Sequence, residues 1–146
     1  MADLTDHVRD LLDAFWQGDW DRTMQYFAED AIYEDPLLAE PVRGRNGILD
    51  VFKYCHAWGR IEGEIRSLVG DDRIAAAELR IRGAVIGPIE GLPDDVVGRT
   101  FDFAEVDVFE FNADGKVRRE TIYPDVTTLM RQLGQTNGPG HTGDAR

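Results

Sequence analysis

Two acids lie among phenylalanines on one face of a predicted strand, a combination that could support acid–base chemistry. Side chains on a strand alternate between its two faces, so a strand over 100–111 would place its odd-numbered residues together. This face comprises Phe101, Phe103, Glu105, Asp107, Phe109 and Phe111. Burying a carboxylate beside aromatic rings is unfavourable unless the group is paired or neutralised. The pattern therefore indicates a site for these acids or a proton held on one of them.

A β-hairpin would add a third acid to this face. The segment 112–115, Asn-Ala-Asp-Gly, has the composition of a turn, and the returning strand is predicted over 116–123. A turn centred on this segment would place Glu120 directly opposite Asp107, with their Cβ atoms about 5 Å apart. Two carboxyls this close rarely ionise together, so the pKa of one is expected to rise.

A simpler interpretation of these acids stays open. They could lie on a solvated face of the sheet and have no chemical role. They could also form salt bridges with arginines, for which the candidates are Arg80, Arg82, Arg99 and Arg119.

Asp35 is a separate candidate, because it ends a short predicted strand over 31–34 and precedes Pro36. A residue before proline is disfavoured in a helix, so the chain holds this carboxyl rigidly. By itself, however, the pattern is that of a turn-forming aspartate.

The spacing of apolar residues predicts the elements that position these acids. A first helix ends at Gly18 and has one apolar stripe, formed by Leu4, Val8, Leu11, Leu12 and Phe15. Short helices are expected after Asp19 and after Asp125, with a longer one between them over 47–58. The expected strands cover 31–34, 61–69, 73–86, 100–111 and 116–123. Helices followed by antiparallel strands indicate an α+β fold, with the helices packed on one face of a curved sheet.

The length and the net charge limit the classes of protein to which this chain could belong. The 146 residues fit one domain, expected over 1–134, and residues 135–146 have little to bury and are expected to form a flexible C-terminal tail. The net charge of −12 argues against nucleic acid and anionic membrane surfaces as partners. No apolar run is long enough to span a bilayer, and the acidic start lacks the pattern of a signal peptide. A cytoplasmic location is therefore expected.

The residues that most often hold metals or cofactors are sparse. His7, His56 and His141 are scattered along the chain, and Cys55 is the single cysteine. No histidine pair has the spacing of metal ligands, and no glycine-rich phosphate loop opens a helix. We therefore expect neither a metal nor a cofactor.

Several segments resemble a known family. The segment 27–36, Phe-Ala-Glu-Asp-Ala-Ile-Tyr-Glu-Asp-Pro, and the segment 40–44, Glu-Pro-Val-Arg-Gly, resemble the opening of the ketosteroid isomerases, within the nuclear transport factor 2-like and SnoaL-like superfamily. The segments 107–111 and 114–117 are similar to the family's penultimate strand and its turn. The resemblance covers roughly residues 5–133. It implies a cone-shaped α+β barrel, in which three to four helices wrap a curved antiparallel sheet around an apolar pocket.

The resemblance also implies roles for the two central acids. Asp35 corresponds to the family's general base, and Asp107 to its protonated aspartic acid that binds the oxyanion; this pair is known from ketosteroid isomerase itself. The expected activity is that of a steroid delta-isomerase, which moves a proton next to a carbonyl in an apolar ring ligand without a cofactor. Glu120 would couple to the protonation of Asp107. The expected ligand contacts are Tyr33, Trp58, Phe103, Glu105, Phe109 and Glu120.

Two departures from the family pattern leave other functions open. Leu11 and Phe52 stand where the isomerases have tyrosines, so Tyr26, Tyr54 or Trp58 would have to replace the lost donor. A non-catalytic module that binds a small molecule is one alternative. A homodimer formed through the exposed sheet face is expected by analogy with the superfamily.

Two other enzymes of the superfamily are further alternatives. The long segment 83–99 resembles SnoaL-like polyketide cyclases, with Asp125 as the acid near the end of the last strand. An epoxide hydrolase would need an Asp-Arg-Asp network, which Tyr33 and Arg80 could join. However, Arg82 and Ile122 occupy the positions of its acids.

Overall fold

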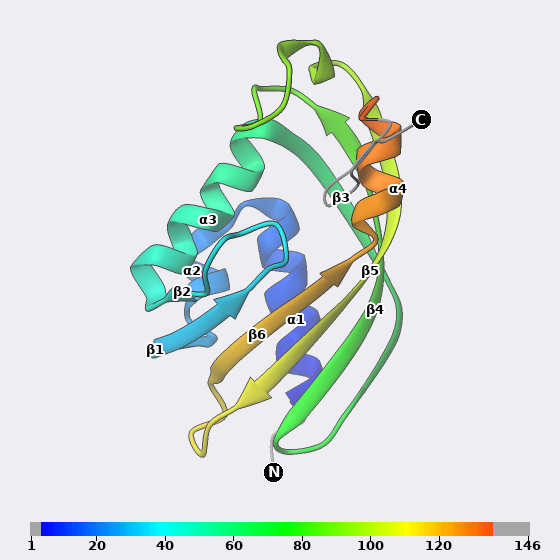
Figure 1. Cartoon of the computed structure of the whole chain (residues 1–146). Coiled ribbons are helices and arrows are strands. Elements are labelled where there is room, and N and C mark those ends of the chain that lie inside the picture. The colour runs from blue at the N-terminus through cyan, green and yellow to red at the C-terminus, as the bar shows by residue number, and fades with distance from the viewer. Residues whose placement is uncertain (1–3, 136–146) are drawn as a thin grey trace.

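A curved six-stranded sheet organises the chain in a computed structural model, which describes residues 4–135 (Figure 1). The strand order is β2-β1-β6-β5-β4-β3. The strands are β1 (Phe27–Glu34), β2 (Val42–Arg43), β3 (Gly59–Gly70), β4 (Ile74–Val85), β5 (Thr100–Phe111) and β6 (Val117–Pro124). The helices are α1 (Leu4–Gln17), α2 (Trp20–Met24), α3 (Arg45–Trp58) and α4 (Val126–Gln132), with a short 3₁₀ turn over Asp94–Val96.

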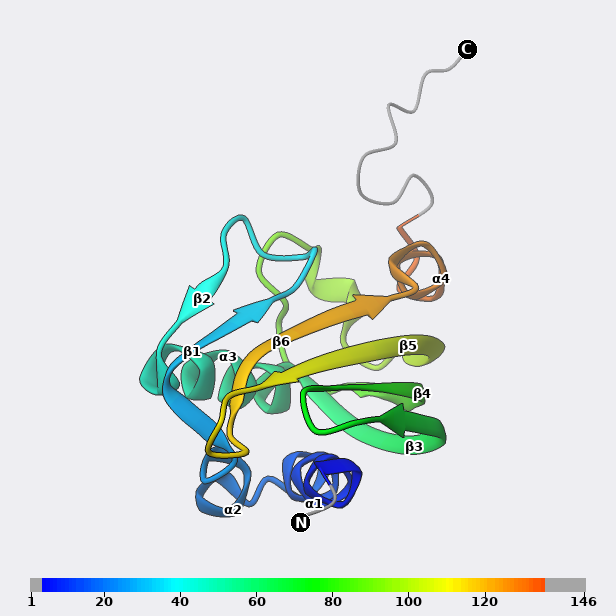
Figure 2. The same ribbon diagram turned by 90° about the horizontal axis from the view of Figure 1, so that it is seen from below.

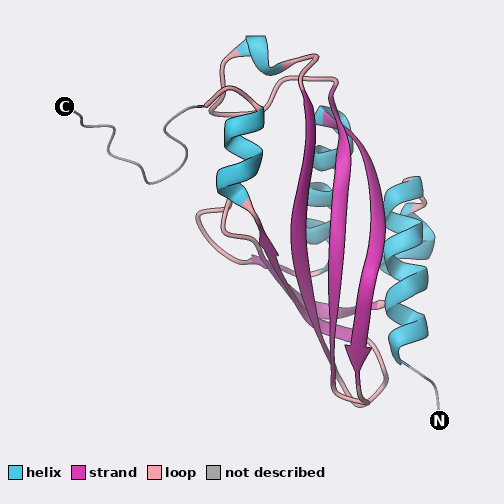
Figure 3. Cartoon of the chain, turned by 90° about the vertical axis from the view of Figure 1, so that its right-hand side faces the viewer, coloured by secondary structure: helices cyan, strands magenta, loops and turns pink. Residues whose placement is uncertain are grey.

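The helices and the sheet form the expected α+β arrangement. Figure 2 shows α1, α2 and α3 on the same side of the sheet, while α4 follows β6 and contacts β5. The sheet curves around these helices as a cone, and β2 and β3 stay at its two edges rather than pairing to close a barrel. Figure 3 shows the long strands β3, β4 and β5 running side by side between α1 and α4.

The helices begin and bury their side chains where the sequence predicts. In α1 the apolar stripe buries Leu4, Val8, Leu11 and Leu12, whereas Phe15 is partly buried against the core. Asp19 caps α2, since its carboxylate accepts a hydrogen bond from the Arg22 backbone N–H at 3.2 Å. None of the described helices is long and apolar enough to cross a membrane.

The first strand departs from the sequence prediction in length and in direction. β1 begins at Phe27 rather than Ala31, because Phe27 and Ala28 are themselves buried. It runs parallel to β6, with Tyr33 in register with Glu120, so the sheet is mixed rather than purely antiparallel. The short strand β2 lies in a segment where no strand is predicted, and it pairs with the end of β1.

The hairpin register differs from the prediction by two residues. Asp107 faces Ile122, and Glu120 faces Phe109 instead of Asp107. The turn holds one residue more than predicted, because the Asn112 N–H donates to the Lys116 carbonyl at 2.8 Å, and Gly115 adopts a φ of 77°. A bulge in the ladder next to Phe111 adds the second residue. Because the two shifts sum to an even number, Asp107 and Glu120 still share one face of the sheet.

The expected tail falls mostly beyond the described residues. Residues 136–146 lie outside the part of the chain that the structure describes. The single domain predicted over 1–134 is described from Leu4 onward, and one sheet runs through it.

A glycine on β3 allows α1 to approach the sheet closely. A Cβ atom built at Gly63 would lie 1.9 Å from Cε2 of Trp16, so the indole occupies the space that any side chain would need. Trp16 thereby contacts β3 at the position where α1 and the sheet meet.

We predict that Gly63→Ala lowers the free energy of unfolding by roughly 1–3 kcal/mol, because the indole must move to admit the methyl group. Urea unfolding would measure the change. The matched control is Glu62→Ala at the neighbouring exposed position, which should change the stability by less than about 0.5 kcal/mol. Equal effects of the two substitutions would show that close packing at Gly63 is not what stabilises this contact.

Candidate active site

A largely apolar cavity of about 110 Å³ lies between the sheet and the helices. Its apolar wall comes from α1, α3, α4 and the middle of the sheet, with the side chains Leu11, Leu12, Phe15, Trp16, Leu37, Phe52, Trp58, Ile61, Leu79, Ile81, Phe101, Phe103, Ile122, Pro124 and Leu129. The polar side chains that line it are Tyr33, Asp35, Cys55, Glu105, Asp107 and Glu120. The cavity therefore collects all four acids that the sequence places on an aromatic face or at a strand end.

Asp107 and Glu120 are removed almost completely from water. Their exposed fractions are 3% and 4%. The Asp107 carboxyl hydrogen-bonds to the carboxyls of both Glu105 and Glu120, so the three groups form a chain across β5 and β6. A hydrogen bond between two carboxyls needs a proton on one of them. This geometry therefore holds protons inside the cavity.

Burial raises the pKa of every member of this chain. The pKa of Glu105 lies well above its ordinary value because of burial and the neighbouring Asp107 charge. Burial is also the largest cause for Asp107, whose pKa is well above its ordinary value despite an opposing hydrogen bond from Glu105. For Glu120, burial followed by the Glu105 charge raises the pKa to about 8. At neutral pH Glu120 is therefore predominantly protonated, and burial favours the protonated form of Glu105 and Asp107 as well.

Asp35 lies at the edge of the same cavity and is less buried. One carboxylate oxygen accepts a hydrogen bond from the Leu37 N–H at 2.8 Å, and the other accepts one from the Tyr33 hydroxyl at 3.5 Å. Burial raises the pKa of Asp35, while the Leu37 hydrogen bond opposes the rise. Asp35 therefore forms the turn before Leu37 and also lines the cavity, so both interpretations of this residue hold.

Tyr33 is the tyrosine that lines this cavity within residues 4–135. Its ring packs edge-on against Phe52, with centroids 5.5 Å apart, and burial together with the Asp35 charge raises the pKa of its hydroxyl well above the ordinary value. Leu11 and Phe52 line the wall at the two positions where the isomerases have tyrosines. The Tyr33 hydroxyl is therefore a neutral phenol inside the cavity, and it donates to Asp35.

The two other tyrosines considered as replacements point elsewhere. The Tyr26 hydroxyl donates to Asp10, next to the salt bridge that Asp10 forms with Arg22. The Tyr54 hydroxyl accepts the Glu90 backbone N–H at 2.8 Å and fixes the loop after β4. Neither lines the cavity.

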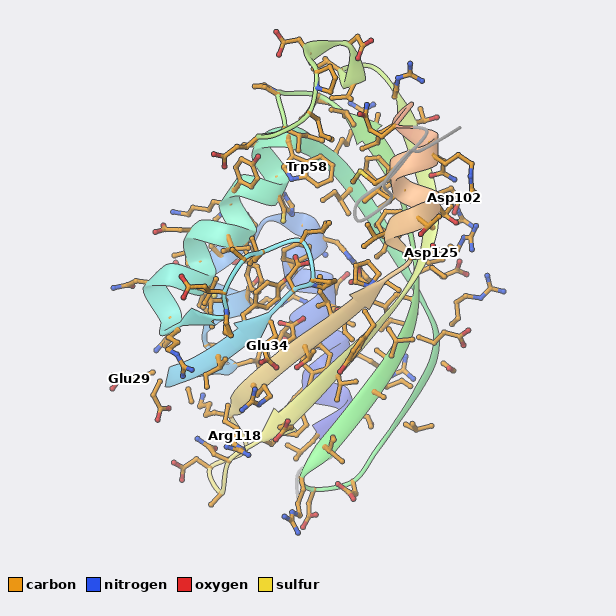
Figure 4. The ribbon with its side chains drawn as sticks, in the orientation of Figure 1. Glu29, Glu34, Trp58, Asp102, Arg118 and Asp125 are labelled. Atoms are coloured by element: carbon orange, nitrogen blue, oxygen red, sulfur yellow. The ribbon has the colours of Figure 1, made fainter. Side chains whose placement is uncertain are left out.

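The predicted ligand contacts divide into those that line the cavity and one that does not. Phe103 lines it, and Trp58 lies at the end of α3, where its ring contacts Phe101 with centroids 5.8 Å apart (Figure 4). Phe109 was predicted as a ligand contact, but it does not line the cavity. It lies on β5 between Asp107 and the hairpin, where it is fully buried in the core. Cys55 also lines the cavity, which its place on the apolar side of a helix could have indicated.

Asp125 and Arg80, which the alternative reactions would use, lie outside the cavity, whereas Tyr33 lines it. Asp125 caps α4 by accepting the Thr128 N–H at 3.0 Å, and hydrogen bonds from Thr128 lower its pKa. Arg80 forms a salt bridge with Asp102 at 2.6 Å. Figure 4 places Asp102 and Asp125 on the α4 side of the sheet. Among the described residues, no arginine lines the cavity, so the Asp-Arg-Asp network of an epoxide hydrolase is not present there.

The histidine nearest in sequence to the cavity wall packs away from it. The His56 ring lies between Trp20 and Phe15, with centroids 4.8 Å and 5.1 Å away. Over residues 4–135, no group of three or more histidine, cysteine or acidic side chains is arranged to hold a metal ion.

The fold and the cavity agree with the family model that matches the chain. The SnoaL-like domain matches residues 8–120, which include all four cavity acids. The chain belongs to the SnoaL-like family. A comparison with curated proteins gave no match.

Solved structures with the same fold include enzymes of different kinds. A candidate polyketide cyclase from Xanthomonas campestris pv. campestris is 25% identical, with a TM-score of 0.80 over 89% of this chain and 96% of that chain. IdmH, a candidate polyketide cyclase from Streptomyces antibioticus, is 24% identical, with a TM-score of 0.77 over 91% and 99%. An LEH-like epoxide hydrolase from M. tuberculosis is 20% identical, with a TM-score of 0.71 over 90% of each chain. Likeness at the last two identities shows the fold alone.

We predict that the protein loses stability as the pH rises from about 5 to about 8, and that Glu120→Gln removes part of this loss. Glu120 has an ordinary pKa of 4.5 and a pKa of about 8 in the folded state. Between these values the folded state binds more protons than the unfolded state, so stability is fully present below the lower pKa and falls through the upper one. Glutamine keeps the shape and cannot ionise, so the variant should be the more stable protein at about pH 8.

Urea unfolding of both proteins at the two pH values would measure this effect. Glu62→Gln is the control, because Glu62 is exposed on β3 and should leave the pH dependence unchanged. An equal loss of stability with pH in wild type and Glu120→Gln would contradict the proton-holding role of the cluster.

Proposed function

We propose that this SnoaL-like protein is a cofactor-independent enzyme that removes a proton next to a carbonyl group in an apolar ring ligand. The observation that carries the proposal is the pairing, in one apolar cavity, of a partly buried carboxylate at Asp35 with a fully buried, proton-holding carboxyl at Asp107. A base and a neutral hydrogen-bond donor are the two groups that enolisation requires.

The reaction follows from the placement of these two groups. The Asp35 carboxylate takes the proton from the carbon next to the carbonyl, the C–H electron pair forms a carbon–carbon double bond, and the carbonyl π pair moves to oxygen. Asp107 donates a hydrogen bond to that oxygen and stabilises the negative charge that develops on it. In a β,γ-unsaturated ketone the resulting dienolate takes the proton back from Asp35 at another carbon, which is an isomerisation. In a cyclisation the enolate carbon instead attacks a second carbonyl of the same molecule, and the oxygen of that carbonyl takes the proton from Asp35 as the new carbon–carbon bond forms.

The remaining cavity residues hold the ligand and the proton on Asp107. Tyr33, Trp58 and Phe103 contact the ring system, and Tyr33 also donates to Asp35. Burial and the neighbouring Glu120 carboxyl keep Asp107 protonated, whereas the hydrogen bond with Glu105 favours its ionised form. Phe109 is left out of the ligand contacts because it lies outside the cavity.

Cyclisation of a polyketide-like ring is the favoured form of this chemistry. The family match and the neighbours named as candidate cyclases support it, and Leu11 and Phe52 leave a steroid isomerase without its usual tyrosines. The tests below would also reveal steroid isomerisation or non-catalytic binding, if either is the true function.

We also propose that the protein forms a homodimer through the exposed sheet face and is located in the cytoplasm. Size-exclusion chromatography would test the dimer.

We predict that the protein accelerates exchange of the protons next to the carbonyl of 2-tetralone in D₂O, and that Asp35→Asn slows this exchange by at least about 100-fold. Proton NMR follows the loss of signal and detects proton removal whichever reaction comes next. Asp30→Asn is the matched control, because Asp30 is exposed on the same strand and should leave the rate unchanged. No acceleration over buffer, or equal rates for Asp35→Asn and wild type, would leave a binding role instead.

Isomerisation of a β,γ-unsaturated 3-ketosteroid, followed by ultraviolet absorbance, separates the two reactions. We expect exchange without efficient isomerisation, since the Leu11 and Phe52 side chains offer no hydrogen bond. Fast isomerisation would establish the steroid activity in its place.

We predict a bell-shaped dependence of kcat/KM on pH for the exchange reaction. The acid limb reports ionisation of Asp35 and should lie above its ordinary pKa of 3.8, because burial raises it. The alkaline limb reports ionisation of Glu120 in the buried cluster and should lie near its pKa, about 8. The variant Glu120→Gln should move the alkaline limb to higher pH, and an unchanged limb would contradict the coupling to Asp107.

A further inference from the structure

The charges that face the cavity are all of one sign. The titratable side chains of its wall are Tyr33 on β1, Asp35 just after β1, Cys55 on α3, Glu105 and Asp107 on β5, and Glu120 on β6. Among the described residues, α1, β4 and α4 contribute only apolar side chains to this wall, and no lysine, arginine or histidine lines it. A ligand that carried a carboxylate would therefore meet several acids and no cation.

Two oxygens of the cluster still lack a partner. Asp107 Oδ1 and Glu120 Oε1 are buried and find no hydrogen-bond partner in the described part of the chain. Folding has already removed both from water, so a ligand that contacts them adds no desolvation of these groups. Asp107 is the neutral donor to the carbonyl in the proposed function, which leaves Glu120 Oε1 to be satisfied by a donor on the ligand.

We infer that the ligand carries a basic amine near its carbonyl group, and that its ammonium binds Glu120 Oε1 while its apolar ring fills the aromatic part of the cavity. An ammonium offsets the charge that Glu120 would otherwise carry alone, and it can also rest against the faces of Trp58, Phe101 or Phe103. The inference rests on the proposed function for the position of the carbonyl and on the cavity alone for the amine.

Binding of such a ligand is coupled to release of a proton. Glu120 is predominantly protonated at neutral pH, because its pKa is about 8, so the ammonium binds as Glu120 gives its proton to solvent. A primary amine stays protonated throughout the neutral range. The affinity for an amine should therefore rise by up to about tenfold per pH unit until Glu120 is ionised in the free protein, whereas the affinity for a neutral ligand of the same shape should not.

Isothermal titration calorimetry with benzylamine and benzyl alcohol tests the inference without any turnover, because the two probes differ only in the polar group. At about pH 7.5 we expect benzylamine to bind at least about tenfold more tightly than benzyl alcohol. This preference should shrink toward about pH 6. Titrations in two buffers of different ionisation enthalpy should show about one proton released per benzylamine bound.

Variants locate the binding to the cavity. Glu120→Gln should abolish the preference for benzylamine and leave benzyl alcohol unaffected, and urea unfolding checks that the variant is folded. Glu62→Gln, which removes an exposed acid, should leave both affinities unchanged. Equal or weaker binding of benzylamine in the wild type, no proton release, or a preference that survives Glu120→Gln would each overturn the inference.

The result of the benzylamine binding test does not depend on whether the protein catalyses the proposed reaction. Absence of exchange in 2-tetralone would remove the catalytic proposal and leave the preference for an amine in place. Equal binding of the two probes would remove the inference and leave the catalytic proposal standing.

Discussion

Keeping carboxyl groups out of water is the constraint on which the rest of this structure depends. Thr23, Asp107 and Glu120 are the fully buried polar residues of the described chain, and the two acids lie together in one apolar cavity. Such groups are tolerated when they stay neutral and hydrogen-bond to one another. The hydrogen-bonded chain through Asp107 meets this condition by holding protons. The aromatic wall that makes the acids costly to ionise is the same feature that makes them useful as donors.

The sheet brings these groups together from distant parts of the chain. Because β1 lies parallel to β6, Tyr33 stands in register with Glu120, and Asp35 follows at the end of the strand. Because β5 and β6 form a hairpin, Glu120 lies on the same face as Asp107. The helices α1 and α3 then close the cavity from the concave side with apolar side chains, including Leu11 and Phe52. Tyr33, Glu120 and Asp107 therefore come from three neighbouring strands, β1, β6 and β5, which hold them more rigidly than loops would.

Much of the fold followed from local patterns, and the errors have identifiable causes. The strand 100–111 and the stripe of α1 could be predicted because periods of two and 3.6 residues are read directly from apolar spacing. The hairpin register could not, because a turn of three residues and a β-bulge depend on the backbone conformation around Gly115. Asp107 and Glu120 kept their shared face only because the error was even. Phe109 was misplaced because alternation gives the face of a strand but not how far along it the cavity extends.

The sequence by itself determined which residue types are available: acids among phenylalanines on β5, an aspartate at a strand end before proline, and apolar residues at Leu11 and Phe52. These are local properties, fixed by composition and by the alternation of side chains. Only the tertiary structure decided which acids share a cavity, that Asp125 lies outside it, and that Tyr33 reaches Asp35. Proximity between β1, β5 and β6 depends on strand pairing across many residues, and pairing is set by the packing of the whole core rather than by any short segment.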